Sequence, residues 1–293
     1  MTFPTSFTGS GWTATWSISA LISKTGEEDL DTAQEQKLEH ICRKLRLQPG
    51  ERLLDIGCGW GGLLCWAASR YGIEGIGITL SDQQFAYARE RVAAMGLERK
   101  VEIHRRDYRE VPDQVHYDKI VSMGMYEHVS LANLPAYFGA IARLLRPGGI
   151  ALNHGITTTD CDGHAQGPPD GEFIDRLVFP GSEVPHVSRV LYEIAGTGLE
   201  LLDIEDLRPH YPPTLLHWAR RLETQRDKAV MAAGAQAIAS GGCSGCTCRL
   251  WRMPSIGAGS RCISSSRKRT GRTDWRPGGG PAPINMCRLN RCG

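Results

Sequence analysis

Long apolar stretches are missing from this sequence. Residues 1–23 contain no basic segment followed by an apolar one, and nowhere in the 293 residues do roughly 18 apolar residues stand in a row. Neither a secretory leader nor a transmembrane segment is therefore expected. We predict a protein of the cytoplasm.

Acidic residues are scarce near the C-terminus. Residues 231–293 hold ten Lys or Arg residues, one acid, Asp274, and six of the ten cysteines. The hydrophobic fraction of the whole chain is 41%, which is ordinary for a globular protein. We predict a globular domain over residues 24–230 and a disordered, basic tail rich in Cys, Gly and Arg over residues 231–293.

A glycine-rich turn follows the first clear apolar run. Residues 51–72 read ERLLDIGCGWGGLLCWAASRYG, so a short apolar run reaches Asp55 and a helical pattern starts at Leu63. This order predicts a buried strand, a turn and a helix. Glycines in the turn let the backbone approach a ligand closely, because no Cβ stands in the way.

An acid is missing at the end of the second strand, where dinucleotide-binding proteins hold the ribose hydroxyls. The strand expected over residues 75–80 has Thr79 and Ser81 at its end instead. Asp55 ahead of G-x-G-x-G resembles motif I of S-adenosylmethionine-dependent methyltransferases, in which the acid orders the turn near the methionine portion. The pattern therefore favours S-adenosylmethionine over a nicotinamide dinucleotide.

Helical and strand patterns continue to alternate along the chain. This alternation predicts an α/β fold with a doubly wound, mostly parallel sheet, whose ligand lies at the carboxyl ends of the strands. The expected helices are residues 82–95, capped by Ser81, and 131–145, stopped by RPGG, and the expected strands are residues 101–104, 117–122 and 150–156.

Six strings stand in this order between Lys24 and about Val230: KTGEEDLDTAQEQKLEHICRKL, GITLSDQQ, MGMYEHV, HGIT, FIDRLVFPGSEVP and LRPHYPPTLLHWARR. Together they resemble the cyclopropane-fatty-acyl-phospholipid synthase family, which includes the mycolic acid cyclopropane synthases. The resemblance implies a Rossmann-like, class I S-adenosylmethionine-dependent methyltransferase.

The resemblance also implies a reaction. A methyl group passes from S-adenosylmethionine to a cis double bond in a phospholipid acyl chain, and the resulting carbocation closes to a cyclopropane when a bound bicarbonate removes a proton. The lipid would be reached at the inner membrane surface. Neither a nucleic acid nor a metal ion would take part.

Three residues match the family positions that hold bicarbonate: Glu127 in MGMYEHV, His154 in HGIT, and Tyr211 in LRPHYPPTLLHWARR. Glu127 would accept a hydrogen bond from bicarbonate, and the other two side chains would donate. Each residue also has an ordinary structural interpretation. Glu127 could cap a helix, His154 could be a half-buried histidine, and Tyr211 could lie at the edge of the core.

The cofactor residues implied by the resemblance follow the first three strands. The expected contacts are Asp55, Gly57, Cys58, Gly59, Gly61 and Gly62 at the methionine and ribose, Thr79, Ser81 and Gln84 at the ribose and the adenine edge, and Asp107 and Tyr108 at the adenine.

The resemblance breaks at both ends of the chain. The family has a segment similar to YDVSNEFYRLWLDRHMVYSCAYF before KTGEEDL, whereas residues 1–23 differ, and Ala20 stands where the family has a bicarbonate-binding cysteine. Codons allowed for residues 1–23 and 250–267 can spell family-like strings in another frame. We interpret residues 1–23 and the tail as out-of-frame translation, and we predict that the last antiparallel strand of the fold is missing.

The tail allows two other interpretations. Cys243, Cys246 and Cys248 form C-x-x-C-x-C, but the second C-x-x-C or histidine pair of a zinc site does not follow. The excess of basic residues would suit a nucleic-acid-binding tail. Out-of-frame translation is favoured, because a GC-rich gene read off frame yields Arg, Gly, Pro, Ser and Cys.

Three functions remain open. The first is a lipid-modifying methyltransferase, the second a non-catalytic remnant that binds S-adenosylmethionine, and the third a small-molecule methyltransferase. The missing cysteine favours the second for this chain, while FIDRLVFPGSEVP argues against the third.

Overall fold

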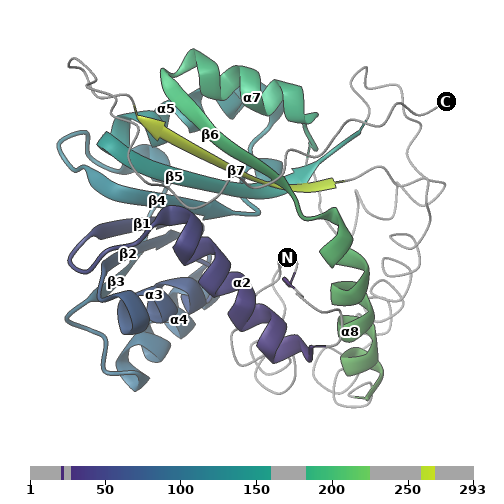
Figure 1. Cartoon of the computed structure of the whole chain (residues 1–293). Coiled ribbons are helices and arrows are strands. Elements are labelled where there is room, and N and C mark those ends of the chain that lie inside the picture. The colour runs from purple at the N-terminus through teal and green to yellow at the C-terminus, as the bar shows by residue number, and fades with distance from the viewer. Residues whose placement is uncertain (1–20, 23–27, 160–182, 225–258, 268–293) are drawn as a thin grey trace, which may run out of the picture.

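One sheet of seven strands organises the protein (Figure 1). The computed structural model describes residues 21–22, 28–159, 183–224 and 259–267. The strand order is β3-β2-β1-β4-β5-β7-β6, and β1 to β5 pair in parallel. The strands are β1 (Arg52–Ile56), β2 (Glu74–Thr79), β3 (Val101–Arg105), β4 (Tyr117–Met123), β5 (Leu145–Thr157), β6 (Leu199–Asp206) and β7 (Gly259–Arg267). The predicted α/β fold with a mostly parallel, doubly wound sheet is confirmed.

Helices cover both faces of this sheet, and the alternation of side chains along β1 shows how. Leu53 packs in a cluster with residues of α2 (Leu30–Leu45), α3 (Gly62–Tyr71) and α4 (Asp82–Ala94). Its neighbour Leu54 packs on the opposite face, with residues of α5 (Leu134–Leu144) and α7 (Val187–Gly196). Successive strand side chains point to opposite faces, so an apolar run fills two separate cores.

Helix α8 (Tyr211–Thr224) leaves the sheet and meets the start of α2 (Figure 1). Trp218 packs against Leu21 and Leu30, and Arg221 forms a 2.9 Å ion pair with Asp31. The backbone N–H of Leu21 donates to the hydroxyl of Thr214 at 3.0 Å. These contacts join the segment after β6 to the segment before β1.

The prediction that the last antiparallel strand is missing is wrong. Strand β7 lies between β5 and β6 and runs antiparallel to both, with Leu152 opposite Ser264 on one side and Ile204 opposite Ile263 on the other. Backbone N–H and C=O groups on both flanks need partners, and an extended segment without proline supplies them whatever its side chains are. The expectation of a disordered tail therefore fails for residues 259–267, and the strand argues against out-of-frame translation there. Residues 1–20 lie outside the described part of the chain.

The expected helix over residues 131–145 is divided. A short 3-10 helix, η3 (Leu131–Asn133), precedes α5, and Pro135 stands in the first turn of α5. Proline suits a first helical turn but not a helix interior, which explains the break. The RPGG segment that was expected to stop the helix belongs to β5, whose pairing with β4 is irregular between Tyr117 and Lys119.

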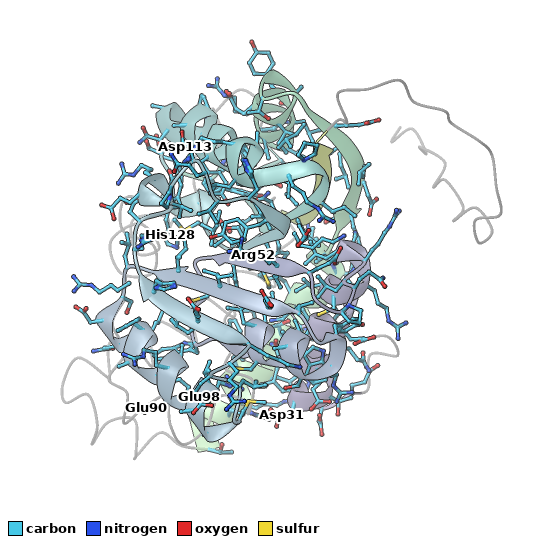
Figure 2. The ribbon with its side chains drawn as sticks, turned by 90° about the vertical axis from the view of Figure 1, so that its left-hand side faces the viewer. Asp31, Arg52, Glu90, Glu98, Asp113 and His128 are labelled. Atoms are coloured by element: carbon cyan, nitrogen blue, oxygen red, sulfur yellow. The ribbon has the colours of Figure 1, made fainter. Side chains whose placement is uncertain are left out.

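Figure 2 shows charged side chains on the outside of the molecule. Glu90 of α4 and Glu98, just beyond its end, lie close to each other in this view, while His128 lies well away from both. His128 ends η2 (Tyr126–His128), which follows β4. The helices of the described segments include none with the length and apolar character of a membrane span.

Candidate functional site

The turn after β1 has the backbone that its glycines were expected to allow. Gly57, Gly59 and Gly61 have φ values of 78°, 54° and 74°, a region that favours glycine. Gly61 is the N-cap of α3, and because glycine has no side chain it forms no capping hydrogen bond with the first N–H groups of the helix. A Cβ at Gly59 would meet no atom of the described residues within 4 Å, so among them this side of the turn is open to a ligand.

Asp55 lies beneath this turn at the end of β1. Its side chain is buried, and burial raises the pKa of its carboxyl to about 7. A cation bound close by would lower that pKa again, because it favours the carboxylate. The turn and Asp55 are therefore chemically suited to the cationic methionine portion of S-adenosylmethionine, and Cys58 is buried beside them with a pKa raised well above its usual value by burial.

The three residues expected near the ribose form one network at the end of β2. The hydroxyl of Thr79 donates to the side-chain oxygen of Gln84 at 2.9 Å and accepts from the N–H of Ser81 at 3.2 Å. Ser81 caps α4 by accepting from the N–H of Gln84, as expected. The structure thus brings them together, and their contact with a ligand stays a prediction.

Asp107 and Tyr108 are tied into the protein after β3. Both carboxylate oxygens of Asp107 accept from the Arg109 guanidinium, at 3.0 and 2.6 Å, which lowers the pKa of Asp107. Tyr108 is buried, and its ring lies edge-on to the ring of Tyr137, with 5.4 Å between the ring centroids. An adenine contact would have to share the Asp107 oxygens with Arg109.

Glu127 is held against β5. It lies in η2, its side chain is buried, and its Oε1 accepts from the backbone N–H of Ile156 at 2.8 Å. The interpretation of Glu127 as a helix cap is therefore wrong, because its partner is a strand residue. Its Oε2 is buried without a hydrogen-bond partner among the described residues, and burial raises the pKa of the carboxyl to about 7.

His154 lies on β5, two residues before that N–H. It is 4% exposed rather than half-buried, and its backbone C=O accepts from Gly124 at 2.8 Å. Burial, followed by the charge of Lys37, lowers the pKa of His154 to about 3, so the imidazole is neutral. Glu127 and His154 thus share one end of β5, and their joint contact with a ligand stays a prediction.

A glycine that sequence reasoning did not single out makes this arrangement possible. A Cβ at Gly155 would lie 2.3 Å from Cζ of Tyr126, so the tyrosine ring rests directly on the backbone of β5. Tyr126 is 1% exposed and precedes Glu127. Close backbone approach is the usual reason for a glycine within a strand, and the pairing of MGMYEHV with HGIT now has a physical cause.

Tyr211 is the first residue of α8, after η5 (Arg208–His210), and it is 7% exposed. This position is compatible with the predicted role. Its meeting with Glu127 and His154 stays a prediction.

Two buried polar residues of α2 were missed. Gln34 is 0% exposed and Lys37 2% exposed, and both face inward with the apolar residues of the helix. The signal was present in the sequence, because they fall at helical spacing inside the apolar stripe Leu30, Ala33, Leu38, Ile41, Cys42 and Leu45.

Within the part of the chain that the structure describes, no cluster of three His, Cys, Asp or Glu residues could hold a metal ion. Cys243, Cys246 and Cys248, Ala20, and most of FIDRLVFPGSEVP lie outside the described residues.

Comparison with known proteins places these features in context. The family described as "Mycolic acid cyclopropane synthetase" matches residues 12–240, which extends beyond both boundaries of the predicted domain. A "Probable fatty acid methyltransferase" of Pseudomonas putida is 46% identical over 227 residues, covering 78% of this chain and 55% of the relative. The "Cyclopropane-fatty-acyl-phospholipid synthase" of Escherichia coli K12 is 39% identical over 194 residues, covering 66% and 48%. The chain spans about half the length of these curated relatives.

Among solved structures, the crystal structure of the mycolic acid cyclopropane synthase CmaA1 complexed with SAH and CTAB is similar, with a TM-score of 0.82 and 25% identity. The similarity covers 90% of this chain and 94% of that chain.

Proposed function

Because this chain belongs to the mycolic acid cyclopropane synthetase family, we propose that it transfers a methyl group from S-adenosylmethionine to the cis double bond of an unsaturated phospholipid acyl chain, which then closes to a cyclopropane. The cofactor supplies an electrophilic methyl group on a sulfonium. The same proposal places the work at a membrane surface facing the cytoplasm, where such acyl chains are found.

The residues of this chain would divide the task by position. The turn over Gly57–Gly62, with Asp55 beneath it, would hold the methionine portion, and the network of Thr79, Ser81 and Gln84 would border the nucleoside. All of them follow β1 or β2 at the carboxyl edge of the sheet, where ligands of such folds bind. Glu127 and His154 stand at the same edge, after β4 and on β5.

The observation that carries the proposal is the oxygen of Glu127 that has no hydrogen-bond partner among the residues that the structure describes. Oε1 is fixed by the Ile156 N–H, so Oε2 is presented from a buried, oriented carboxyl. Buried polar atoms normally have partners, and a bicarbonate hydroxyl would be a donor of suitable size. A bicarbonate oriented by Glu127 and by neutral His154 would be placed to accept the proton that leaves the new methyl group.

Radiolabelled methyl transfer to lipid vesicles tests the proposal. We expect label in vesicles of unsaturated phospholipid and none in saturated ones, since a saturated chain offers no electrons to the sulfonium. Glu127→Gln should lower the rate about 100-fold or more, because a positioned acid–base element is lost. The matched control is Glu193→Gln, which alters a buried glutamate paired with Arg189 on α7.

Equal labelling of saturated and unsaturated vesicles would refute the acyl-alkene substrate. Full activity of Glu127→Gln would refute the role of Glu127. Retained cofactor binding without any transfer by the parent chain would favour the non-catalytic remnant, which the alanine at position 20 also suggests.

A further inference from the structure

A lysine lies inside the protein on α2, a helix that packs on β5, the strand of His154. Lys37 is 2% exposed and belongs to the apolar face of α2, although the same helix has a solvent-facing side where a lysine costs nothing. Burying an ammonium group opposes folding strongly. A buried lysine in this position therefore calls for a role beyond packing.

The surroundings of Lys37 indicate what that role concerns. Helix α2 packs on β5, and the charge of Lys37 is close enough to His154 to disfavour its protonation. The other lysine of α2 lies in its last turn and faces a different strand. Lys44 forms 2.7 Å ion pairs with Asp203 and Glu205 on the edge strand β6.

Neither Glu127 nor His154 supplies positive charge to the proposed site. Glu127 contributes a hydrogen-bond acceptor, and its carboxyl becomes an anion when it ionises. His154 is neutral, because burial and Lys37 hold its pKa near 3. An anion placed between these two groups in a buried site would therefore be bound without positive charge from either of them.

We propose that the ammonium group of Lys37 supplies the positive charge that balances the bicarbonate bound between Glu127 and His154. Lys37 is thus a positioning residue of the reaction, acting on the anion from α2. The inference rests on the proposed function, because it assumes the bicarbonate site. Burial alone lowers the pKa of Lys37 to about 7, and a bound anion would raise it again by favouring the charged form.

Direct binding of ¹³C-labelled bicarbonate, followed by NMR line broadening in the presence of S-adenosylhomocysteine, tests this role without using turnover. Lys37→Met keeps the length of the side chain and removes its charge, and we expect it to weaken bicarbonate binding roughly 10- to 100-fold, the range for a lost charged hydrogen-bond partner. The matched control, Lys44→Met, removes a charge from the same helix and should bind like the parent. Lys37→Arg keeps the charge and should retain most of the affinity.

A structural role alone would give the opposite pattern. Unchanged bicarbonate affinity in Lys37→Met overturns the inference. If Lys37→Met fails to fold, Lys37→Gln takes its place in the same comparison.

Including Glu127→Gln separates this inference from the proposed function. Loss of binding in Glu127→Gln but not in Lys37→Met overturns only the role of Lys37. Absence of bicarbonate binding in the parent overturns both the role of Lys37 and the bicarbonate site, while the vesicle assay still decides methyl transfer.

Discussion

The contact between Tyr126 and β5 predicts the effect of one added methyl group. In Gly155→Ala, the new Cβ would lie 2.3 Å from Cζ and 2.6 Å from Cε1 of a ring that is 1% exposed. Carbon atoms in contact prefer roughly 3.5–4.0 Å, so the ring must retreat by more than about 1 Å into a packed core. Overpacking of this kind costs about 1–3 kcal/mol, and we expect the free energy of unfolding to fall by that amount.

The same displacement should reach the site. Tyr126 directly precedes Glu127, whose Oε1 is held by the Ile156 N–H at 2.8 Å. A shift of η2 would lengthen this hydrogen bond and misplace the carboxyl, since a misplacement of about 1 Å can cost on the order of 100-fold in rate. Urea denaturation measures the stability of Gly155→Ala, and vesicle labelling measures its activity.

A second glycine provides the control. Gly139 lies in α5, and an added Cβ there would have no atom of the described segments within 4 Å. It is not in the left-handed region, so Gly139→Ala should be neutral or stabilising by up to about 1 kcal/mol. In a Tyr126→Leu background, the cost of Gly155→Ala should shrink, because the ring that clashes is gone. If Gly155→Ala matches the parent in both stability and labelling, the packing of Tyr126 on β5 is not what orients Glu127.

Further predictions follow from the turn and from two carboxyl groups. Gly59→Val should abolish S-adenosylmethionine binding in calorimetry. The control is Gly96→Val, which is equally strained at φ 66° but lies beyond the far end of α4 and should bind like the parent. Equal affinities of the two variants would place the cofactor elsewhere. Burial raises the pKa of Glu127 to about 7, so the folded state keeps a proton that the unfolded state has lost above about pH 4.5, and stability falls as pH rises through that window. Glu127→Gln should therefore be more stable than the parent above about pH 7, by up to about 3 kcal/mol in denaturant titrations; a parent whose stability does not change across the window would contradict this. A histidine and a lysine of α2 lower the pKa of Glu205 to about 2, so Glu205→Gln should lower the free energy of unfolding by about 1 kcal/mol or less at neutral pH. This difference in stability should vanish as pH falls from about 4.5 towards 2. A difference that does not depend on pH would contradict the ion-pair origin of the lowered pKa.

Sequence patterns predicted the parts of the fold that depend on interactions between residues close together in the chain. The strand, turn and helix around Asp55 were evident because the apolar run, the glycines and the helical spacing lie next to each other in sequence. Ser81 caps α4 as expected, since capping depends on residues only three positions apart. The family strings then added Glu127 and His154, whose common position at one end of β5 no local pattern could have indicated.

The errors concern contacts between distant segments. The partner of Glu127 is a backbone N–H on β5, and a backbone donor leaves no mark on the sequence. Strand β7 was missed for the same reason, because pairing between two strands depends on free backbone groups more than on composition. Lys37 could have been found, since a lysine within an otherwise apolar helical stripe is a visible conflict between pattern and burial.

Four buried titratable groups lie at or near the edge of the sheet where the proposed reaction takes place. Asp55, Glu127 and His154 stand at one edge of the sheet, near Lys37, and burial shifts the pKa of each towards its neutral form. Each such shift opposes folding whenever the group is ionised, so packing alone would replace these residues with apolar ones. Lys44 and Glu205, by comparison, form an ion pair at 2.7 Å, with 14% and 35% of their side chains exposed. The groups that the fold holds out of water at this edge are where a charged cofactor and an anion would find partners.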